Sequence, residues 1–253
     1  MSDAYNDDWD ALWEEHETAN DANPAQDMRR RLCLRLIGAD GEPGRLLDIG
    51  SGIGQFIEDA HERWPNAELQ GIEMAAKGVE FSRERVPAAR FDVVDLIVAP
   101  KPPAARKAWA THAVCSEVLE HVDDPVVFMR NARAWLAPGC RVVVTVPGGP
   151  ISAFDKSIGH RRHFTPQDVF DLLTEAGYEV ESSTGSGFPF FNVYRRMVVG
   201  RGEKLVQEAE ADGAASSSRV VRAGMVVFGP LLWLSSFRSR WGWQRIAVAR
   251  VPE

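Results

Sequence analysis

Apolar and polar residues follow each other along the chain in short strand-like runs separated by helical patterns. The strand-like runs lie at 45–49, 68–72, 89–94, 110–115, 141–146, 178–182 and 243–248. Apolar residues at helical spacing predict helices between them, at 55–64, 75–85, 126–136 and 166–176. Strands that alternate with helices imply a parallel sheet covered on both faces. Ligands of such sheets bind beyond the carboxyl ends of the strands, so the residues after each strand are the candidates for function.

The helix predicted at 166–176 has the clearest end signals. Thr165 is a favourable N-cap, Pro166 suits the first helical position, and Asp168 can complete a capping box. Gly177 is typical of a helix C-terminus.

Two further segments flank this alternating region. Trp9, Leu12 and Trp13 lie at helical spacing, which predicts a short amphipathic helix, and a second helix is expected at 25–37. Residues 1–43 are therefore interpreted as an N-terminal helical cap, and 44–188 with 242–253 as the core. Residues 189–241 exceed the connection that the core needs, so they form a helical insertion. Three interpretations of this insertion are open. It packs on the core of the same chain, it pairs with a second subunit in a homodimer, or it forms a lid for a lipid-linked acceptor at the membrane.

Charge and cysteine content narrow the class of protein. The net charge of -7 gives no support to nucleic-acid binding. Cys33, Cys115 and Cys140 are scattered and odd in number, which favours a reduced cytoplasmic protein over a disulfide framework or a zinc site. The uncharged run at 223–237 is short for a membrane span of about twenty residues. Peripheral contact with an anionic membrane stays open, because the segment after residue 218 is basic and apolar.

The run LLDIGSGIGQF at 46–56 carries the first candidate site. Glycines at 50, 52 and 54 allow a tight turn and let backbone N–H groups approach a ligand. Asp48 precedes them, where a pyrophosphate would be repelled but a ligand with an ammonium group would be attracted. This chemistry indicates S-adenosylmethionine, with a nicotinamide or flavin site as the competing interpretation.

Acids at two further strand ends agree with that ligand. Glu73 follows the second strand, where a carboxylate accepts the ribose hydroxyls. Asp95 follows the third strand and is expected to bind the adenine amino group, with Leu96 beside it and Met74 against the ring. Asp92 is the competing assignment for this third acid.

The runs LLDIGSGIGQF, GIEM, VVDL and CSEVLEHV, in this order, resemble the class I S-adenosylmethionine-dependent methyltransferases. Within that class the chain is similar to the small-molecule O-methyltransferases of ubiquinone biosynthesis. The resemblance implies an α/β, Rossmann-like fold with a seven-stranded, mostly parallel sheet and an antiparallel last strand. It also implies roles for the strand-end residues. The methionine part would contact Asp48, Gly50, Ser51, Gly52, Ser116 and Glu117, and the ribose would contact Glu73.

Histidines are the candidates on the acceptor side. His121 lies in EVLEHVDDP beyond the fourth strand, and His160 and His163 lie in GHRRHF before the capped helix. An oxygen or nitrogen acceptor loses a proton, for which imidazole is suited. Each histidine also has a structural interpretation: His121 packs a turn, and His163 with Phe164 packs the helix start while the arginines pair with acids such as Asp155.

A divalent metal is not expected. Glu117, Glu120, His121 and Asp124 offer mixed oxygen and nitrogen ligands, but nothing in their spacing fixes a coordination geometry. The sequence thus predicts an enzyme that transfers a methyl group from S-adenosylmethionine to a small-molecule or lipid-linked acceptor, at the oxygen of a sugar hydroxyl, phenol or quinol. The alternative is a non-catalytic module that binds S-adenosylmethionine or S-adenosylhomocysteine.

Overall fold

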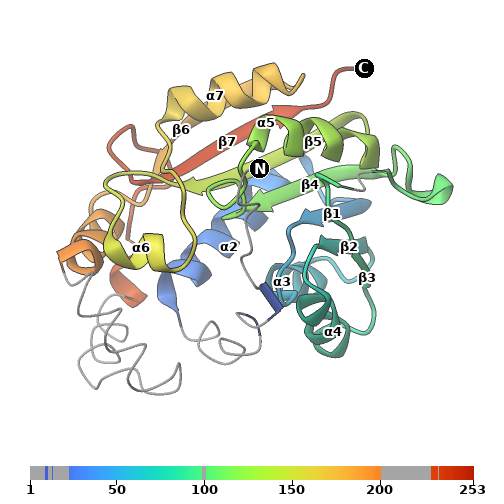
Figure 1. Ribbon diagram of the computed structural model, residues 1–253, viewed down its shortest axis with the longest axis horizontal. Helices are drawn as coiled ribbons and strands as arrows, with labels where there is room; N and C mark the ends of the chain where they lie inside the picture. The colour runs from blue at the N-terminus through green and yellow to red at the C-terminus, as the bar shows by residue number, and fades with distance from the viewer. Residues whose placement is uncertain (1–8, 11–12, 14–22, 99–100, 201–228, 233) are drawn as a thin grey trace, which may run out of the picture.

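The computed structural model describes residues 9–10, 13, 23–98, 101–200, 229–232 and 234–253. Its centre is a seven-stranded sheet with the order β3-β2-β1-β4-β5-β7-β6 (Figure 1). The strands are β1 (Arg45–Ile49), β2 (Glu68–Glu73), β3 (Arg90–Val93), β4 (Ala110–Ser116), β5 (Leu136–Pro147), β6 (Glu179–Ser186) and β7 (Gln244–Arg250). The α/β fold class expected from the alternating pattern is confirmed.

The last strand runs antiparallel to both of its neighbours, as predicted. β7 lies between β5 and β6, with Val143 opposite Val248 on one side and Ser183 opposite Ala247 on the other. β1 pairs in parallel with β2 and with β4, so the carboxyl ends of these three strands lie at the same edge of the sheet. That edge is where the predicted site residues converge.

Helices cover both faces of the sheet (Figure 1). Leu32, Phe56 and Val79 bring three helices into one apolar layer, whereas Met129 and Leu173 bring two others into a second layer on the opposite face. In the described part of the chain the helices include α2 (Pro24–Ile37), α3 (Gln55–Arg63), α4 (Ala76–Arg85), α5 (Pro125–Ala132), α6 (Ala153–Ser157) and α7 (Pro166–Glu175), with short 3-10 turns at Gly38–Asp40, Ala104–Arg106 and Arg133–Trp135.

The helix predicted at 166–176 has the capping box that its sequence indicated. Thr165 accepts the Asp168 N–H, Asp168 accepts the Thr165 N–H, and Pro166 begins the helix. The helix predicted at 126–136 is shorter than expected, because Leu136 already pairs with Ala110.

Two larger differences in strand boundaries also arise in the sheet. Gly139, with a φ of +72°, lies inside β5 rather than at a helix end, opposite an irregularity in the register of β4. β6 extends to Ser186, well beyond the predicted end at 182, since its small polar residues pair with β7 at the edge of the sheet. An edge strand needs no continuous apolar run, so hydrophobicity alone underestimates its length.

Residues 201–228, which make up more than half of the predicted insertion, lie outside the described residues. They include the beginning of the uncharged run at 223–237. Residues 190–200 are helical, and Phe191 packs with Ala25 and Leu232 in a small separate cluster. Within the described part of the chain, no helix combines the length and the apolar character needed to cross a membrane. The three cysteines are free and buried.

Candidate active site

The turn after β1 brings backbone N–H groups to the edge of the sheet. Gly50 has a φ of +75°, and its N–H and that of Ser51 both donate to the carbonyl of Ile72 at the end of β2. Gly54, also left-handed with a φ of +80°, begins α3. A Cβ on Gly50 would lie 2.5 Å from Val118 Cγ2, so the turn needs both the backbone freedom and the small size of glycine at this position.

Two buried acids lie beside this turn. Asp48 is 3% exposed, and burial followed by the charge of Glu73 raises the pKa of its carboxyl to about 8. Burial also raises the pKa of Glu73, against the hydrogen bonds that its oxygens accept from Ala75 N (3.0 Å) and Gly52 N (3.0 Å). A cationic ligand at this edge would offset the cost of two buried carboxylates, which fits the predicted methyl donor.

The residues expected around the adenine lie after β2 and β3. Met74 is half exposed, whereas the Leu96 side chain packs in the core and its carbonyl accepts a hydrogen bond from Asn131 Nδ2 (2.7 Å). Asp95 lies two residues beyond β3 and accepts the N–H groups of Ile97 (2.7 Å) and Val98 (3.1 Å). Asp92, the competing residue, lies within β3, where it accepts hydrogen bonds from Arg90 and Gln70.

The end of β4 holds a residue in a strained conformation. Glu117 has a φ of +57°, and its Oε1 accepts hydrogen bonds from Gln244 Nε2 (2.8 Å) and Thr145 Oγ1 (3.2 Å). Its other oxygen lies 3.6 Å from Arg29 Nε. Ser116, the other predicted residue here, bonds Thr145 through their hydroxyls at 2.8 Å. Strain of this kind in a non-glycine residue is found at functional sites, where surrounding contacts hold it in place.

Arg29 and Gln244 are site residues that the sequence did not indicate. Arg29 comes from α2 and Gln244 from the start of β7, far from Glu117 along the chain. Nothing in their local pattern points to the site, because the contact depends on how α2 and β7 pack beside β4 and β5.

The described residues of the N-terminal segment lie over the glycine turn. The Trp13 ring lies 3.0 Å from the position of a Cβ on Gly52, and 3.2 Å from that on Gly78 in α4. Asp10 accepts the backbone N–H of Lys77 (2.8 Å), so the segment supplies a cap that α4 lacks of its own. Trp9 packs edge-on against His121, with 4.9 Å between ring centroids.

The three predicted histidines form one imidazole cluster beside these rings. His121 and His160 pack edge-on at 4.7 Å between centroids, and His160 and His163 lie at 5.4 Å. His160 Nδ1 and His163 Nε2 are 3.2 Å apart, and His163 Nδ1 lies 3.0 Å from the carbonyl oxygen of Gly149. The turn after β4 and the segment between α6 and α7 thus converge, although they are separated by some forty residues.

A buried ion pair, Asp155 with Arg195, lies next to the imidazole cluster. Both Asp155 oxygens accept hydrogen bonds from Arg195 Nη2, at 3.0 and 2.8 Å, and Asp155 Oδ2 lies 3.8 Å from His163 Nε2. Burial opposes ionisation of Asp155, but Arg195 and the bonds from Ser152 lower its pKa. Arg161 of GHRRHF pairs with an acid, as suggested, but the acid is Asp123 rather than the Asp155 named as an example.

Burial keeps the histidines neutral. It lowers the pKa of His121 to about 4, and, together with the neighbouring His121, it lowers that of His160 to about 3. Burial also lowers the pKa of His163, while the Gly149 bond and Asp155 act in the opposite direction. Near pH 7 all three rings are therefore in the form that can accept a proton.

Buried polar atoms without a partner gather at this site. Among the described residues they include Trp13 Nε1, Ser51 Oγ, His121 Nδ1 and both carboxylate oxygens of Glu120. Buried polar groups are nearly always hydrogen-bonded, so unpartnered ones require an explanation. A polar ligand between the glycine turn and the imidazole cluster would satisfy several of them.

Two overlapping groups in the described residues have the composition of a metal site. Ligand atoms of Glu120, His121 and His160 lie within 4.8 Å of one another, as do those of Asp155, His160 and His163. Arg195 already neutralises Asp155, which argues against a cation in the second group.

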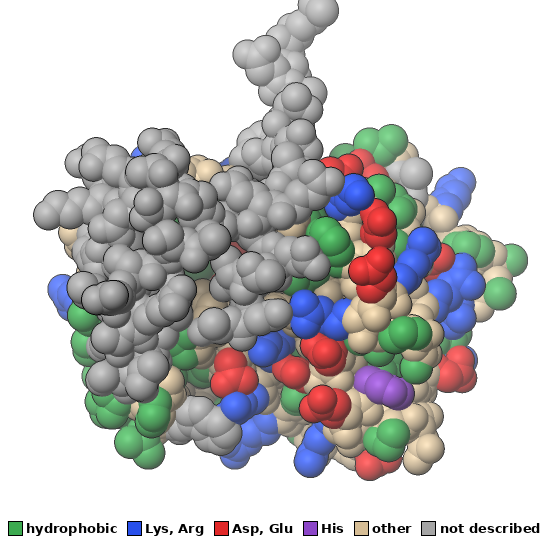
Figure 2. All heavy atoms as spheres, turned by 90° about the horizontal axis from the view of Figure 1, so that it is seen from below, with side chains coloured by type: hydrophobic (Ala, Val, Ile, Leu, Met, Phe, Trp, Pro, Cys, Tyr) green, Lys and Arg blue, Asp and Glu red, His purple; other side chains and the backbone are tan. Residues whose placement is uncertain are grey.

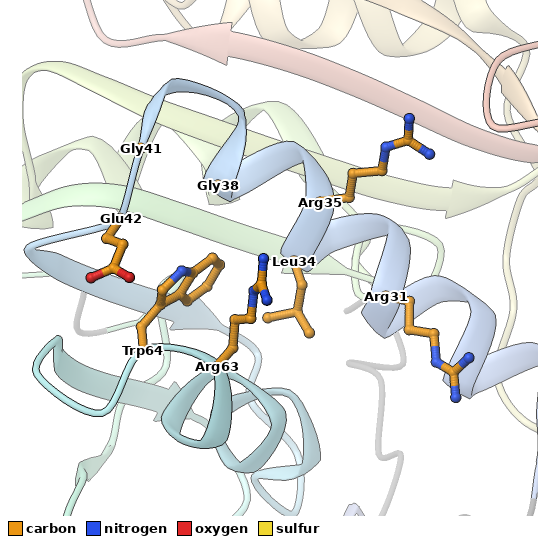
Figure 3. Close-up of a pocket in the computed structure, with 8 residues that line it drawn as sticks. All are labelled: Arg31, Leu34, Arg35, Gly38, Gly41, Glu42, Arg63 and Trp64. Carbon is orange, nitrogen blue, oxygen red and sulfur yellow. The ribbon is translucent and has the colours of Figure 1, made fainter.

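A cleft between α2 and the end of α3, away from this edge, does not have this character. It has a volume of about 570 Å³ and lies beside Trp64 (Figure 3). Its guanidinium groups, on Arg31, Arg35 and Arg63, diverge rather than point to one position (Figure 3). Figure 2 shows acidic and basic side chains side by side on the face it displays.

The fold and this edge define a class of protein: a Rossmann-like methyltransferase with an antiparallel β7 and an acid-and-glycine turn after β1. A family model described as a methyltransferase domain matches residues 22–183, more than half of the chain. The chain belongs to this methyltransferase family, and its cofactor is S-adenosylmethionine.

Two curated relatives and one solved structure illustrate the similarity. Trans-aconitate 2-methyltransferase of Variovorax paradoxus is 30% identical over 142 residues, which are 55% of this chain and 50% of that protein. Ubiquinone biosynthesis O-methyltransferase of Xanthomonas axonopodis pv. citri is 26% identical over 170 residues, 60% of this chain and 70% of that one. The chain spans about half the length of the first curated relatives it matches. The N-methyltransferase NodS of Bradyrhizobium japonicum, solved with S-adenosylhomocysteine, has a TM-score of 0.59 at 17% identity and covers 97% of this chain and 98% of its own, a likeness of fold.

Proposed function

We propose that this protein transfers the methyl group of S-adenosylmethionine to an oxygen atom of a small-molecule acceptor. The observation that carries the proposal is the juxtaposition at the end of β4. The turn that follows Glu117 meets both halves: Val118 lies beside Gly50 of the acid-and-glycine turn, and His121 packs against His160 in the imidazole cluster.

Each half has a separate chemical task. Asp48 would bind the ammonium end of the donor, the glycine N–H groups would border its methionine part, and Glu73 would accept the ribose hydroxyls. When bound, the donor supplies an already activated methyl group. The protein therefore has to align the acceptor, exclude water, and remove the proton that an acceptor hydroxyl loses.

The acceptor class is supported by the relatives and by the charges near the cluster. The names of the two curated relatives refer to trans-aconitate and to ubiquinone biosynthesis, an anion and a route to a quinol. Arg29 and Arg195 lie within the site, each beside an acid, so a carboxylate or phenolate acceptor has cations nearby. A hydroxyl acceptor such as a phenol also needs a base, which a pure binding module does not, whereas a carboxylate acceptor has already lost its proton.

Transfer of a labelled methyl group tests the proposal. The full chain is incubated with methyl-labelled S-adenosylmethionine and trans-aconitate, a demethylated quinol, a simple phenol, a sugar or a lipid extract, and the products are identified by mass. We expect transfer to at least one hydroxyl or carboxylate acceptor. His160→Ala should lower transfer to a hydroxyl acceptor by roughly a hundredfold or more, whereas His61→Ala on α3 should not. Donor binding without transfer to any acceptor would contradict the proposal and favour the non-catalytic module.

A further inference from the structure

The hydrogen bonds of two histidines fix where their protons lie. His163 Nδ1 is 3.0 Å from the carbonyl oxygen of Gly149, and His163 Nε2 is 3.2 Å from His160 Nδ1. A carbonyl oxygen only accepts, so His163 Nδ1 carries a hydrogen. A neutral imidazole carries one hydrogen, so His163 Nε2 has a lone pair and accepts from His160 Nδ1–H.

It follows that His160 has its free lone pair on Nε2. The bond to His163 occupies His160 Nδ1, so the Nε2 lone pair is the one that a methyl acceptor can meet. The opposite tautomer of neutral His163 would place its Nδ1 lone pair 3.0 Å from the lone pairs of Gly149. Backbone geometry at Gly149 therefore determines which nitrogen of a different residue, His160, can take up a proton.

We propose that His160 Nε2 accepts the proton of the methyl acceptor and that His163 relays the charge toward Asp155. This inference rests on the proposed function. The donor's S–C bond breaks with its electron pair remaining on sulfur, and the acceptor oxygen forms the new C–O bond. The acceptor O–H bond breaks as His160 Nε2–H forms, and His160 Nδ1–H passes to His163 Nε2. The products are a neutral His160, an imidazolium at His163 and S-adenosylhomocysteine.

The charges around the pair favour this direction of transfer. His163 Nε2 lies 3.8 Å from Asp155 Oδ2, which Arg195 keeps ionised. The groups that face His160 are His121, Asp155, His163 and Arg195, and Glu117 also acts on His163. Burial and two neighbouring rings disfavour a lasting charge on His160, so the charge is better placed one ring further, beside the carboxylate.

His121 does not have this arrangement. Its Nδ1 is buried without a partner, and its nearest carboxylate, on Glu120, lies 4.0 Å from Nε2. Burial, followed by the charge of Glu117, raises the pKa of Glu120 well above its usual range, which makes its carboxyl a poor partner for an imidazolium. His121 instead packs between Trp9 and His160, where it limits the space open to the acceptor.

Nitrogen NMR of the full chain tests the tautomer without any acceptor. Protein with ¹⁵N-labelled histidines is measured near pH 7 with S-adenosylhomocysteine, and the His160 signals are assigned by their loss in His160→Asn. We expect His160 with hydrogen on Nδ1 and a bare Nε2. His163→Leu should return it to the Nε2–H form that free histidine favours, and His163→Gln, whose oxygen can still accept, should preserve the wild-type form. An Nε2–H tautomer in the wild type would overturn the proposal, whether or not either variant folds.

Kinetics with an accepted substrate then separate relay from structure. We expect His163→Leu to lower kcat by roughly a hundredfold while KM and S-adenosylhomocysteine binding stay within about twofold, and His163→Gln to recover part of the loss. Unchanged kcat in His163→Leu would refute the relay. Failure of the proposed function would look different, because methyl transfer would be absent from the wild type while the His160 tautomer was still as predicted.

Discussion

Replacing Asp48 by asparagine removes a buried acid from the cofactor edge. Burial and the charge of Glu73 raise the pKa of this carboxyl to about 8, whereas in the unfolded chain it titrates near ~3.9. Between these values the folded protein keeps a proton that the unfolded chain releases. The wild-type protein therefore loses stability as pH rises from about 4 to about 8, and this loss levels off above the folded pKa.

The size of the effect follows from the width of that interval. Each pH unit between the two pKa values is worth about 1.4 kcal/mol, so wild type loses about 4 kcal/mol between pH ~5 and pH ~8 through this group. Asparagine has nearly the same shape and does not titrate. We therefore expect Asp48→Asn to exceed the wild type in free energy of unfolding by a margin that grows by about this amount over the interval.

Urea unfolding of the ligand-free proteins near pH 5 and near pH 8 measures the difference in free energy of unfolding between Asp48→Asn and wild type. Glu62→Gln removes a carboxylate from the exposed side of α3 and serves as the control, for which we expect no such growth. In parallel, calorimetric titration should show S-adenosylmethionine binding to Asp48→Asn at least about tenfold more weakly, since its ammonium group loses its partner. A margin that stays constant or shrinks as pH rises would refute the reasoning.

Three further substitutions address the turn, its cover and the buried charge pair. Gly50→Ala forces a Cβ to within 2.5 Å of Val118 at a left-handed φ, and should cost roughly 2–4 kcal/mol in urea unfolding. Adding Val118→Ala should recover only the part of this lost stability that the clash causes. Full recovery would contradict the strain expected from a left-handed φ at residue 50. Trp13→Ala should speed S-adenosylhomocysteine release by roughly tenfold in stopped flow, and an unchanged rate would show that the ring does not cover the ligand. Arg195→Gln removes the ion-pair partner of Asp155 and should lower the free energy of unfolding by about 3–5 kcal/mol near pH 7, measured by thermal unfolding. The difference between wild type and variant should become smaller as the pH falls below about 4, because Asp155 then takes up a proton. A difference that is independent of pH would exclude the ion pair as its cause.

The cofactor half of the site was predictable because its information is local. Asp48 and Glu73 lie at the ends of apolar runs, and the glycines after Asp48 specify a turn by their spacing. In a parallel sheet, neighbouring strand ends meet at one edge whatever the loops do, so residues distant in sequence could be grouped without knowing the packing. The capping box of α7 was predictable for the same reason, since Thr165 and Asp168 are three residues apart.

The contacts of the acceptor half are mostly long-range. Sequence proximity suggested that the GHRRHF arginines would pair with Asp155, yet its partner is Arg195, on the helical segment that follows β6. Arg29 and Gln244 reach Glu117 from α2 and β7. Such pairs depend on the relative placement of elements, which hydrophobic periodicity does not encode. The histidines were found only because imidazole is a chemically informative residue type.

The turn after β4 explains why the two halves depend on each other. Glu117 holds a left-handed conformation that costs of order 1 kcal/mol, stabilised by its bonds to Thr145 and Gln244. The next residue, Val118, occupies the space beside Gly50 that a side chain there would need, and His121 three residues on meets Trp9. One turn therefore sets both the shape of the donor turn and the position of the first imidazole. A change in its backbone would move the donor turn together with His121, the ring that packs against His160. The strain at Glu117 is therefore best understood as the condition for holding both halves of the site in their relative positions.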